Sequence, residues 1–278
     1  MTFEFNNVYI KNTATIAGHL EAKGPLNKYF DKTHKDFYVN SKSLEKSEVN
    51  LQKESIDTLI DKENITKEQI DILISGDLQN QITASSYAAK DYEIPLIGVY
   101  SACATSTQSI ILASTILESK KAKNIICTTS SNNLVSEKQF RNPVEYGAPS
   151  PKTKTFTSTG GASILLTNEK TNIKITSGTI GKIIDLNQND PNHMGAVMAP
   201  AAADTIYNHL KNNNEKVSDY DLILTGDLGI YGKKIRKTID KSRAILYYIG
   251  EIRNTGGKDA SCLGRKRAGV ALFFYNSY

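Results

Sequence analysis

The feature that most constrains the fold is a repeated stretch of sequence. Residues 71–78 read DILISGDL and residues 221–228 read DLILTGDL, so an apolar run ending in Gly-Asp-Leu returns 150 residues later, at 221 instead of 71. Each copy follows a polar lead with a helix or turn cap, ITKEQI in one case and KVSDY in the other. A short continuous apolar run is typical of a strand buried on both faces of a sheet. The repeat favours a duplicated α/β half over a chance recurrence of an apolar run before Gly-Asp.

The length of the chain limits the second copy. The first copy continues through further strand and helix patterns to Thr167, and 278 residues leave no room for an equally long continuation behind Asp221. We therefore predict an N-terminal half over residues 1–170. The C-terminal half, residues 171–278, is expected to be shortened, and to diverge after about residue 232.

The order of the remaining patterns predicts the fold class. A helix is expected over 41–60 and another over 84–90, and Thr66 is placed to cap a helical turn. Buried strands are expected over 71–75, 94–100 and 124–129, and an antiparallel pair from 160–167 with 173–184. Strands that alternate with helices indicate an α/β fold with parallel pairing. The segment after Tyr100 is rich in small residues and predicts a central helix that can be buried.

Composition excludes several classes of protein. Hydrophobic residues make up 39% and charged residues 23%, as in an ordinary globular protein, and no apolar run is long enough for a membrane helix. We expect a soluble protein without a cofactor. The net charge of +5 is scattered among acidic residues, so we predict no nucleic-acid partner. Three cysteines and four scattered histidines show no metal-ligand spacing, so neither a metal site nor a disulfide is predicted.

Cys103 is the residue whose position most clearly suggests a chemical role. It follows a predicted strand and opens a predicted helix, and a helix N-terminus lowers the pKa of a thiol and attracts anions. The position therefore suits a nucleophile or an anion site. The alternative is a small buried residue at a crowded junction. Cys127 lies within an apolar strand and is assigned to the core, and His209 is assigned to the surface.

Several irregular segments carry a family resemblance. They are SGDLQNQITASS (75–86), IGVYSACATST (97–107), EKQFRNPVEYG (137–147) and MAPAAADTI (198–206). These segments resemble the stage V sporulation protein AD family of spore-forming bacteria, a branch of the thiolase and ketoacyl-synthase fold. The resemblance is dense to about residue 230, and beyond it only NTGGKDASCLG, with Gly256, Gly257 and Cys262, is similar. It implies a thiolase-like fold of two duplicated α/β halves with buried central helices, the second half abridged.

The resemblance also implies a function. Proteins of this family are expected to bind dipicolinic acid (pyridine-2,6-dicarboxylate), free or with calcium, and to act in its uptake into the developing spore. The implied partners are membrane proteins of the same sporulation operon, with the protein on the cytoplasmic side and peripherally associated with the spore inner membrane. A homodimer is expected, with strand 123–129 as the edge that pairs across the two-fold axis.

Four residues carried over from the resemblance form the predicted ligand site: Asp77, Cys103, His193 and Asp227. Taken singly, the two aspartates also suit turns or caps, and His193 suits a solvated loop. Arg141 and Tyr146 could clamp a carboxylate or anchor a loop. Two other functions stay open: an acyltransferase of the thiolase and ketoacyl-synthase type with Cys103 as nucleophile, and a structural assembly factor. An acyltransferase needs a base, yet Thr225-Gly226-Asp227 stands where the ketosynthase histidine is expected and no histidine follows His209.

Overall fold

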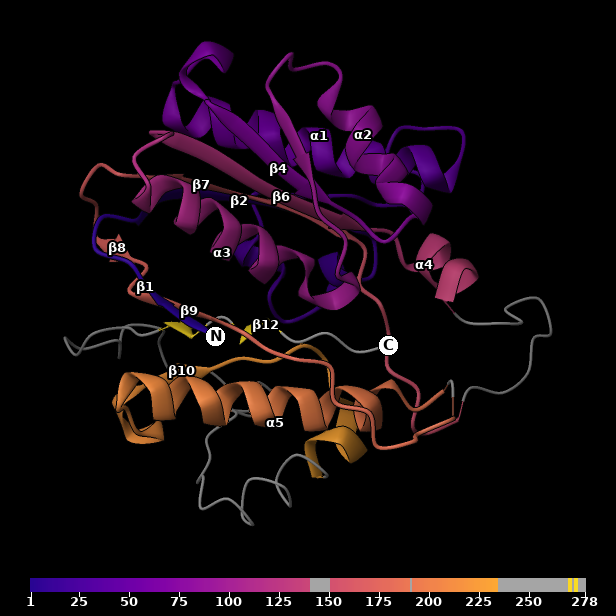
Figure 1. Ribbon diagram of the computed structural model, residues 1–278. Coiled ribbons are helices and arrows are strands. Elements are labelled where there is room, and N and C mark those ends of the chain that lie inside the picture. Colours follow the sequence, from indigo (N-terminus) through magenta and orange to yellow (C-terminus); the bar gives the residue numbers. More distant parts are fainter. Residues whose placement is uncertain (141–150, 191, 235–269, 272, 275–278) are drawn as a thin grey trace. The chain divides into compact units, whose positions relative to one another are not determined.

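The computed structural model describes residues 1–140, 151–190, 192–234, 270–271 and 273–274 (Figure 1). It divides into two compact units, which are treated separately below. The larger unit holds residues 4–150 and 156–177, and the smaller holds 1–3, 151–155 and 178–278. The predicted halves, 1–170 and 171–278, are defined by the sequence repeat and not by packing, so these units do not test them. The halves stay a prediction. Among the described residues, no helix combines the length and the apolarity that crossing a bilayer requires.

A mixed seven-stranded sheet is the framework of the larger unit. Its strand order is β3-β2-β7-β6-β4-β5, and β8 also pairs with β2. The parallel pairs are β4 with β5, β4 with β6, and β2 with β3, and parallel pairing is what the sequence predicts, whereas β7 runs antiparallel to both β6 and β2. The strands are β2 (Tyr9–Ala17), β3 (Lys32–Thr33), β4 (Ile72–Gly76), β5 (Leu96–Gly98), β6 (Asn124–Ser131), β7 (Gly160–Thr167) and β8 (Ile173–Lys174).

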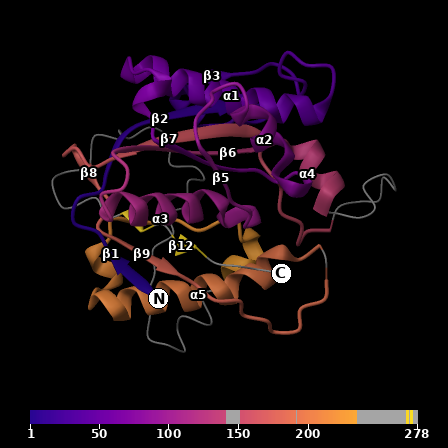
Figure 2. The same cartoon turned by 45° about the horizontal axis from the view of Figure 1, so that its top comes forward.

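Helices cover both faces of this sheet. In Figures 1 and 2, α1 and α2 lie on one face and α3 on the other. The core between α1 and the sheet contains Ile56, Leu59, Leu73 and Ile126, all fully buried. The larger unit also contains α4 and several single 3-10 turns. The bounds are α1 (Leu44–Glu63), α2 (Thr83–Ala89), α3 (Thr105–Glu118), α4 (Asn133–Phe140), η1 (Glu21–Lys23), η2 (Asn27–Tyr29), η3 (Lys67–Gln69), η4 (Asn80–Ile82) and η5 (Ala102–Ala104).

The smaller unit is built around one long helix. Helix α5 runs from Met194 to Asn213 and buries an alanine-rich face that includes Ala199, Ala201 and Ala202. β9 pairs with β1 and β12, and β10 pairs in parallel with β11. The bounds are β1 (Thr2–Glu4), β9 (Ser177–Ile180), η7 (Val217–Asp219), β10 (Leu222–Ile223), β11 (Val270–Ala271) and β12 (Phe273–Phe274).

The repeat extends well beyond the eight residues that revealed it. Helices α1 and α5 are both 20 residues long, begin 150 residues apart, and end at an asparagine in the left-handed conformation, Asn64 in one and Asn214 in the other. Each is followed by a 3-10 turn in which the third residue, Gln69 or Asp219, accepts through its side chain from the N-cap backbone N–H, and then by the echo strand, β4 or β10. The caps fix the lengths of the helices, so the two segments share one backbone plan.

Two strand predictions are wrong, one in its pairing and one in its burial. Residues 160–167 do not pair with 173–184, because β7 lies between β2 and β6, while the later segment forms β8 and β9. The strand predicted over 94–100 is short and lies at the sheet edge, where Leu96 is 40% exposed. A continuous apolar run does not distinguish an edge strand from a central one.

The edge assigned to strand 123–129 is also wrong. That strand, β6, is paired on one side with β4 and on the other with β7, so it cannot pair with a second chain. The edges of the sheet are β5, which pairs only with β4 in the part of the chain that the structure describes, and on the far side β3 and β8, which pair with β2. The homodimer therefore stays a prediction, with β5 as one available edge.

Candidate functional site

Cys103 lies at the junction between β5 and α3, in the turn η5. The thiol is exposed, so the alternative of a small buried residue is wrong. The residue before it, Ala102, has a φ of 44°, a left-handed conformation that costs an L-residue on the order of 1–2 kcal/mol. Thr105 holds the turn: its hydroxyl oxygen accepts from the Ser101 N–H at 3.0 Å and donates to the Ala102 carbonyl at 2.8 Å. The junction presents a thiol to solvent from a constrained backbone.

Gly76 explains why the first echo carries a glycine. It is the last residue of β4, and a Cβ atom there would lie 2.2 Å from the Val99 carbonyl oxygen and 2.4 Å from the Thr105 methyl group. These two residues bracket the turn that presents Cys103. The absence of a side chain thus allows β4 to approach this turn closely.

Asp77 follows Gly76 and is almost fully buried. One carboxylate oxygen accepts from the Gln79 N–H at 2.8 Å and the other from the Ser85 N–H at 2.7 Å. Burial raises the pKa of Asp77, and the hydrogen bonds from Ser85 and Gln79 oppose that effect. Both oxygens therefore accept hydrogen bonds from the backbone between β4 and α2. This favours the interpretation of Asp77 as a turn or cap residue over a ligand contact.

Asp227 repeats the local turn of Asp77 in the smaller unit. Its carboxylate accepts from the N–H two residues ahead, at Gly229, at 2.9 Å, just as Asp77 accepts from Gln79. Gly229 has a φ of 60°, which glycine adopts without cost. Unlike Asp77, Asp227 is exposed, so its carboxylate can still meet solvent or a ligand.

His193 is the N-cap of α5. Its Nδ1 accepts from the Ala196 N–H at 3.2 Å, so the ring holds the first turn of the helix in the way that Ser43 holds α1. The ring also makes an edge contact with Tyr231, 6.0 Å between centroids. Because Nδ1 accepts a hydrogen bond, the neutral ring carries its proton on Nε2.

The structure brings the predicted residues together in two pairs. Asp77 and Cys103 belong to the larger unit, where Gly76 contacts the chain on either side of Cys103. His193 and Asp227 belong to the smaller unit, where a Cβ atom on Gly195 would lie 2.0 Å from the Leu228 carbonyl oxygen. Each pair thus joins the echo turn to the neighbouring helix start. Arg141, Tyr146, Gly256, Gly257 and Cys262 lie outside the described residues.

The sequence analysis did not predict the burial of two titratable side chains, Glu48 and His209. Glu48 in α1 is fully buried, and burial raises its pKa to about 7, while a hydrogen bond from the Gln79 side-chain amide at 3.0 Å opposes this. A glutamate on the same helical stripe as Leu51 and Leu59 is the signal that could have found it. Cys127 is buried as predicted, and burial raises the pKa of its thiol to about 12.

His209 is the second group, and its assignment to the surface is wrong. The ring is 2% exposed; Nδ1 lies 2.8 Å from the Thr179 hydroxyl and Nε2 lies 2.9 Å from the Tyr220 hydroxyl. Tyr220 in turn donates to Glu215. Burial lowers the pKa of His209. Among the described residues, no three His, Cys, Asp or Glu side chains gather into a group that could hold a metal ion.

Solved structures define the class of fold. A cerulenin-bound OleA of Xanthomonas campestris matches with a TM-score of 0.60 and 14% identity, covering 88% of this chain and 81% of that one. A 3-oxoacyl-(acyl carrier protein) synthase III, FabH, of Xanthomonas oryzae matches with a TM-score of 0.59 and 13% identity, covering 88% and 83%. The chain therefore has the mixed α/β fold of the thiolase-like condensing enzymes.

Sequence comparison then identifies the family within that class. The model of the Stage V sporulation protein AD family matches residues 1–260. Stage V sporulation protein AD of Bacillus subtilis (strain 168) is 42% identical over 234 residues, which cover 84% of this chain and 69% of that protein. The chain belongs to the Stage V sporulation protein AD family, as the sequence resemblance predicted.

Proposed function

We propose that this protein binds dipicolinic acid without chemical conversion and acts in its uptake into the developing spore. The observation that carries the proposal is the residue in the second echo turn. Asp227 stands there, where a ketosynthase is expected to carry its histidine, and its carboxylate accepts from the Gly229 N–H at 2.9 Å. A condensing enzyme needs a histidine or another base that can move a proton at the substrate. The aspartate in this turn supports a site that uses Cys103 for position and not for covalent chemistry.

The exposed thiol and its constrained turn are suited to an approaching anion. The residues after Cys103 open the 14-residue helix α3, whose first N–H groups lack partners within the helix. A planar dianion such as pyridine-2,6-dicarboxylate would direct one carboxylate at this end. That His193 and Asp227 of the smaller unit also bind the ligand, Asp227 through a calcium ion when calcium is present, stays a prediction from the sequence.

Cysteine variants test the role of the thiol. Cys103→Ser keeps a small polar group, so dipicolinate affinity should fall by no more than the loss of one neutral hydrogen bond, about 1 kcal/mol. Cys103→Leu should abolish binding, because its side chain fills the approach to the helix. Calorimetric titration with dipicolinate, in calcium and in chelator, measures both variants. Complete loss of binding in Cys103→Ser would contradict the proposal.

Histidine variants separate the cap from the ligand contact. Asparagine is a strong N-cap, so His193→Asn keeps the start of α5 and removes only the imidazole, whereas His193→Ala removes both. His193→Ala should lose about 1 kcal/mol of stability and His193→Asn little. If the imidazole meets a carboxylate, both variants should weaken dipicolinate binding equally. Unchanged affinity in His193→Asn would remove His193 from the site.

The second candidate function is acyl transfer through Cys103, which the exposed thiol and the fold of OleA and FabH favour. Incubation with acyl-CoA followed by intact-mass measurement decides between the two. An acyl adduct that is absent from Cys103→Ser supports the enzyme. Ligand-dependent thermal stabilisation by dipicolinate without an adduct supports the binding protein.

We further propose that membrane proteins of the same sporulation operon are partners, with this protein peripherally associated on the cytoplasmic side of the spore inner membrane.

A further inference from the structure

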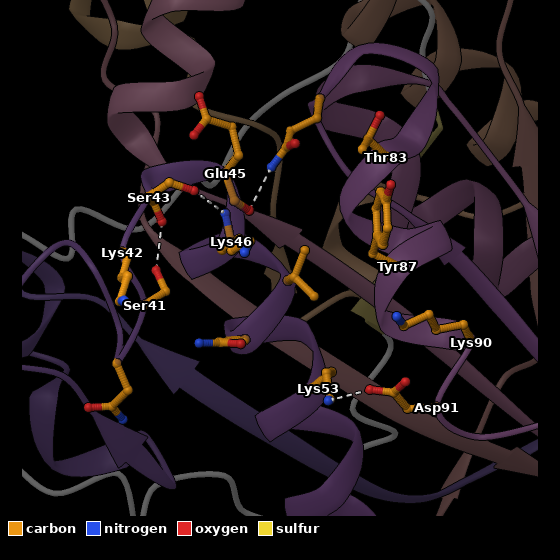
Figure 3. A pocket seen from close by; sticks show the side chains of 14 residues that line it. Ser41, Lys42, Ser43, Glu45, Lys46, Lys53, Thr83, Tyr87, Lys90 and Asp91 are labelled. Atoms are coloured by element: carbon orange, nitrogen blue, oxygen red, sulfur yellow. Dashed lines mark hydrogen bonds and ion pairs between the residues drawn. The ribbon is translucent and has the colours of Figure 1, made fainter.

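A groove between α1 and α2 lies in the larger unit, outside the site described above. Figure 3 shows it from close by, with Lys46 and Lys53 on the α1 wall and Tyr87 and Lys90 on the α2 wall. Its volume is about 660 Å³, within the range of pockets that hold small molecules. Lys42, Lys46, Tyr87 and Lys90 are exposed, so the groove is open to solvent.

The charge of this groove is unbalanced. Four lysines line it, Lys42, Lys46, Lys53 and Lys90, against two carboxylates, Glu45 and Asp91. The Lys53 ammonium pairs with Asp91 at 2.5 Å, which leaves Glu45 as the other acidic group in the lining. In the described part of the chain, Lys42, Lys46 and Lys90 form no ion pair within 4.0 Å. The lining therefore carries two more positive than negative charges.

Neutral groups complete the lining. Lys90 lies over the Tyr87 ring, with its ammonium 5.8 Å from the ring centroid. Val49 adds an apolar surface, and Asn50 and Thr83 add hydrogen-bonding groups. This combination of cations on two walls, an aromatic ring and neutral polar groups is the chemistry that recognises a small molecule with two negative charges.

We propose that the groove binds a small dianion, either a phosphate compound or a dicarboxylate, between the lysines of its two walls. Lys42 and Lys46 approach the ligand from the start of α1, and Lys90 approaches it from the end of α2. The groove lies on the face of the sheet covered by α1 and α2, whereas α3, which follows Cys103, covers the other face (Figures 1 and 2). The groove and α3 therefore lie on opposite faces of the sheet, although Gln79, whose N–H bonds to Asp77, also lines the groove. This proposal does not depend on the function proposed for Cys103.

The test uses the full chain and two probes, inorganic pyrophosphate and dipicolinate, titrated by calorimetry at low and high salt. The groove variant is Lys42→Gln/Lys46→Gln/Lys90→Gln. The control variant, Lys121→Gln/Lys123→Gln/Lys170→Gln, removes the same charge from exposed lysines elsewhere in the same unit. Cys103→Leu reports on the other site. Thermal melting confirms that the variants are folded.

In the Cys103→Leu background, where the site at Cys103 is closed, we expect saturable binding of at least one probe that weakens with salt. This binding should fall at least tenfold when the groove substitutions are added and change less than twofold when the control substitutions are added. Pyrophosphate alone would identify a phosphate site, and dipicolinate alone a dicarboxylate site. Equal weakening in the groove and control variants, or no binding of either probe, would overturn the proposal. Dipicolinate binding that only Cys103→Leu abolishes, with no pyrophosphate binding, would also overturn it while leaving the function proposed for Cys103 intact.

Discussion

Replacing Glu48 by Gln should remove a pH-dependent loss of stability from the larger unit. Glu48 has no exposed surface. Its Oε2 accepts from the Gln79 amide at 3.0 Å, a contact that the side-chain oxygen of Gln at this position would keep. The substitution thus changes the charge of the group while keeping its shape.

The size of the effect follows from the pKa of Glu48, which burial raises from its ordinary 4.5 to about 7. The folded state therefore holds the proton more tightly than the unfolded state does. The associated stability is fully present below pH 4.5 and is lost as pH rises to about 7. That pKa difference corresponds to about 3 kcal/mol of unfolding free energy. The nearby Asp77 carboxylate acts in the same direction, because a like charge disfavours ionisation of Glu48.

Urea unfolding at pH 4 and at pH 8 measures the effect. Glu48→Gln should match the wild-type stability at the acidic end and exceed it by about 3 kcal/mol at pH 8. Glu45→Gln, an exposed glutamate in the first turn of the same helix, is the control and should leave the pH dependence unchanged. The comparison cancels contributions from other titrating groups. If wild type and Glu48→Gln lose the same stability between these pH values, the buried charge is not its cause.

Three other outcomes are expected. Burial lowers the pKa of His209 below its ordinary 6.5, so the folded state disfavours the protonated ring. The stability that depends on the neutral ring is fully present above pH 6.5 and is lost as pH falls from 6.5 through the lowered pKa of the folded state. His209→Gln should remove this acid sensitivity in pH-dependent melts, and an unchanged profile would contradict it. Leu96→Lys should give a monomer in light scattering where the wild type gives a dimer through the β5 edge, and a wild-type monomer would refute the pairing. Gly195→Ala should destabilise by about 1–3 kcal/mol, because the new methyl group meets the Leu228 carbonyl, whereas Gly24→Ala, where the nearest atom is 3.2 Å away, should cost less in the same denaturant titration.

The sequence predicted those parts of the fold that local patterns determine. The echo of residues 71–78 in 221–228 identified a real structural repeat, because in both copies the aspartate accepts from the N–H two residues ahead and the strand follows a capped helix of the same length. The second strand is not buried on both faces as predicted, since Leu222 is 39% and Leu224 46% exposed. Pairing partners were harder to predict. Whether 160–167 pairs with the next segment or with β2 and β6 depends on contacts with residues more than 100 positions away in β2 and 29 to 43 positions away in β6, and periodicity carries no information about them.

The candidate site was predictable to a similar degree. Cys103 was placed correctly at a strand-to-helix junction, since small residues after a strand mark such a turn. The burial of Glu48 and His209 was missed because it depends on which helix face meets the sheet. The structural use of Asp77 and His193 became visible only when their backbone partners, at Ser85 and Ala196, were placed in space.

The shared plan of α1 and α5 has a consequence for how the two copies diverged. Both keep the same length and end at the same kind of cap, yet their inward faces differ: Glu48, Gln52 and Ser55 line one, and Met198, Ala202 and Thr205 stand at the equivalent places in the other. Because caps at the helix ends fix the frame, the interior of each copy could change without altering the loops. The position of Glu48 is titratable in one copy and is held by an apolar methionine in the other, while the second copy buries its own titratable group, His209, further along α5, so each copy responds to pH from a different place on the same scaffold.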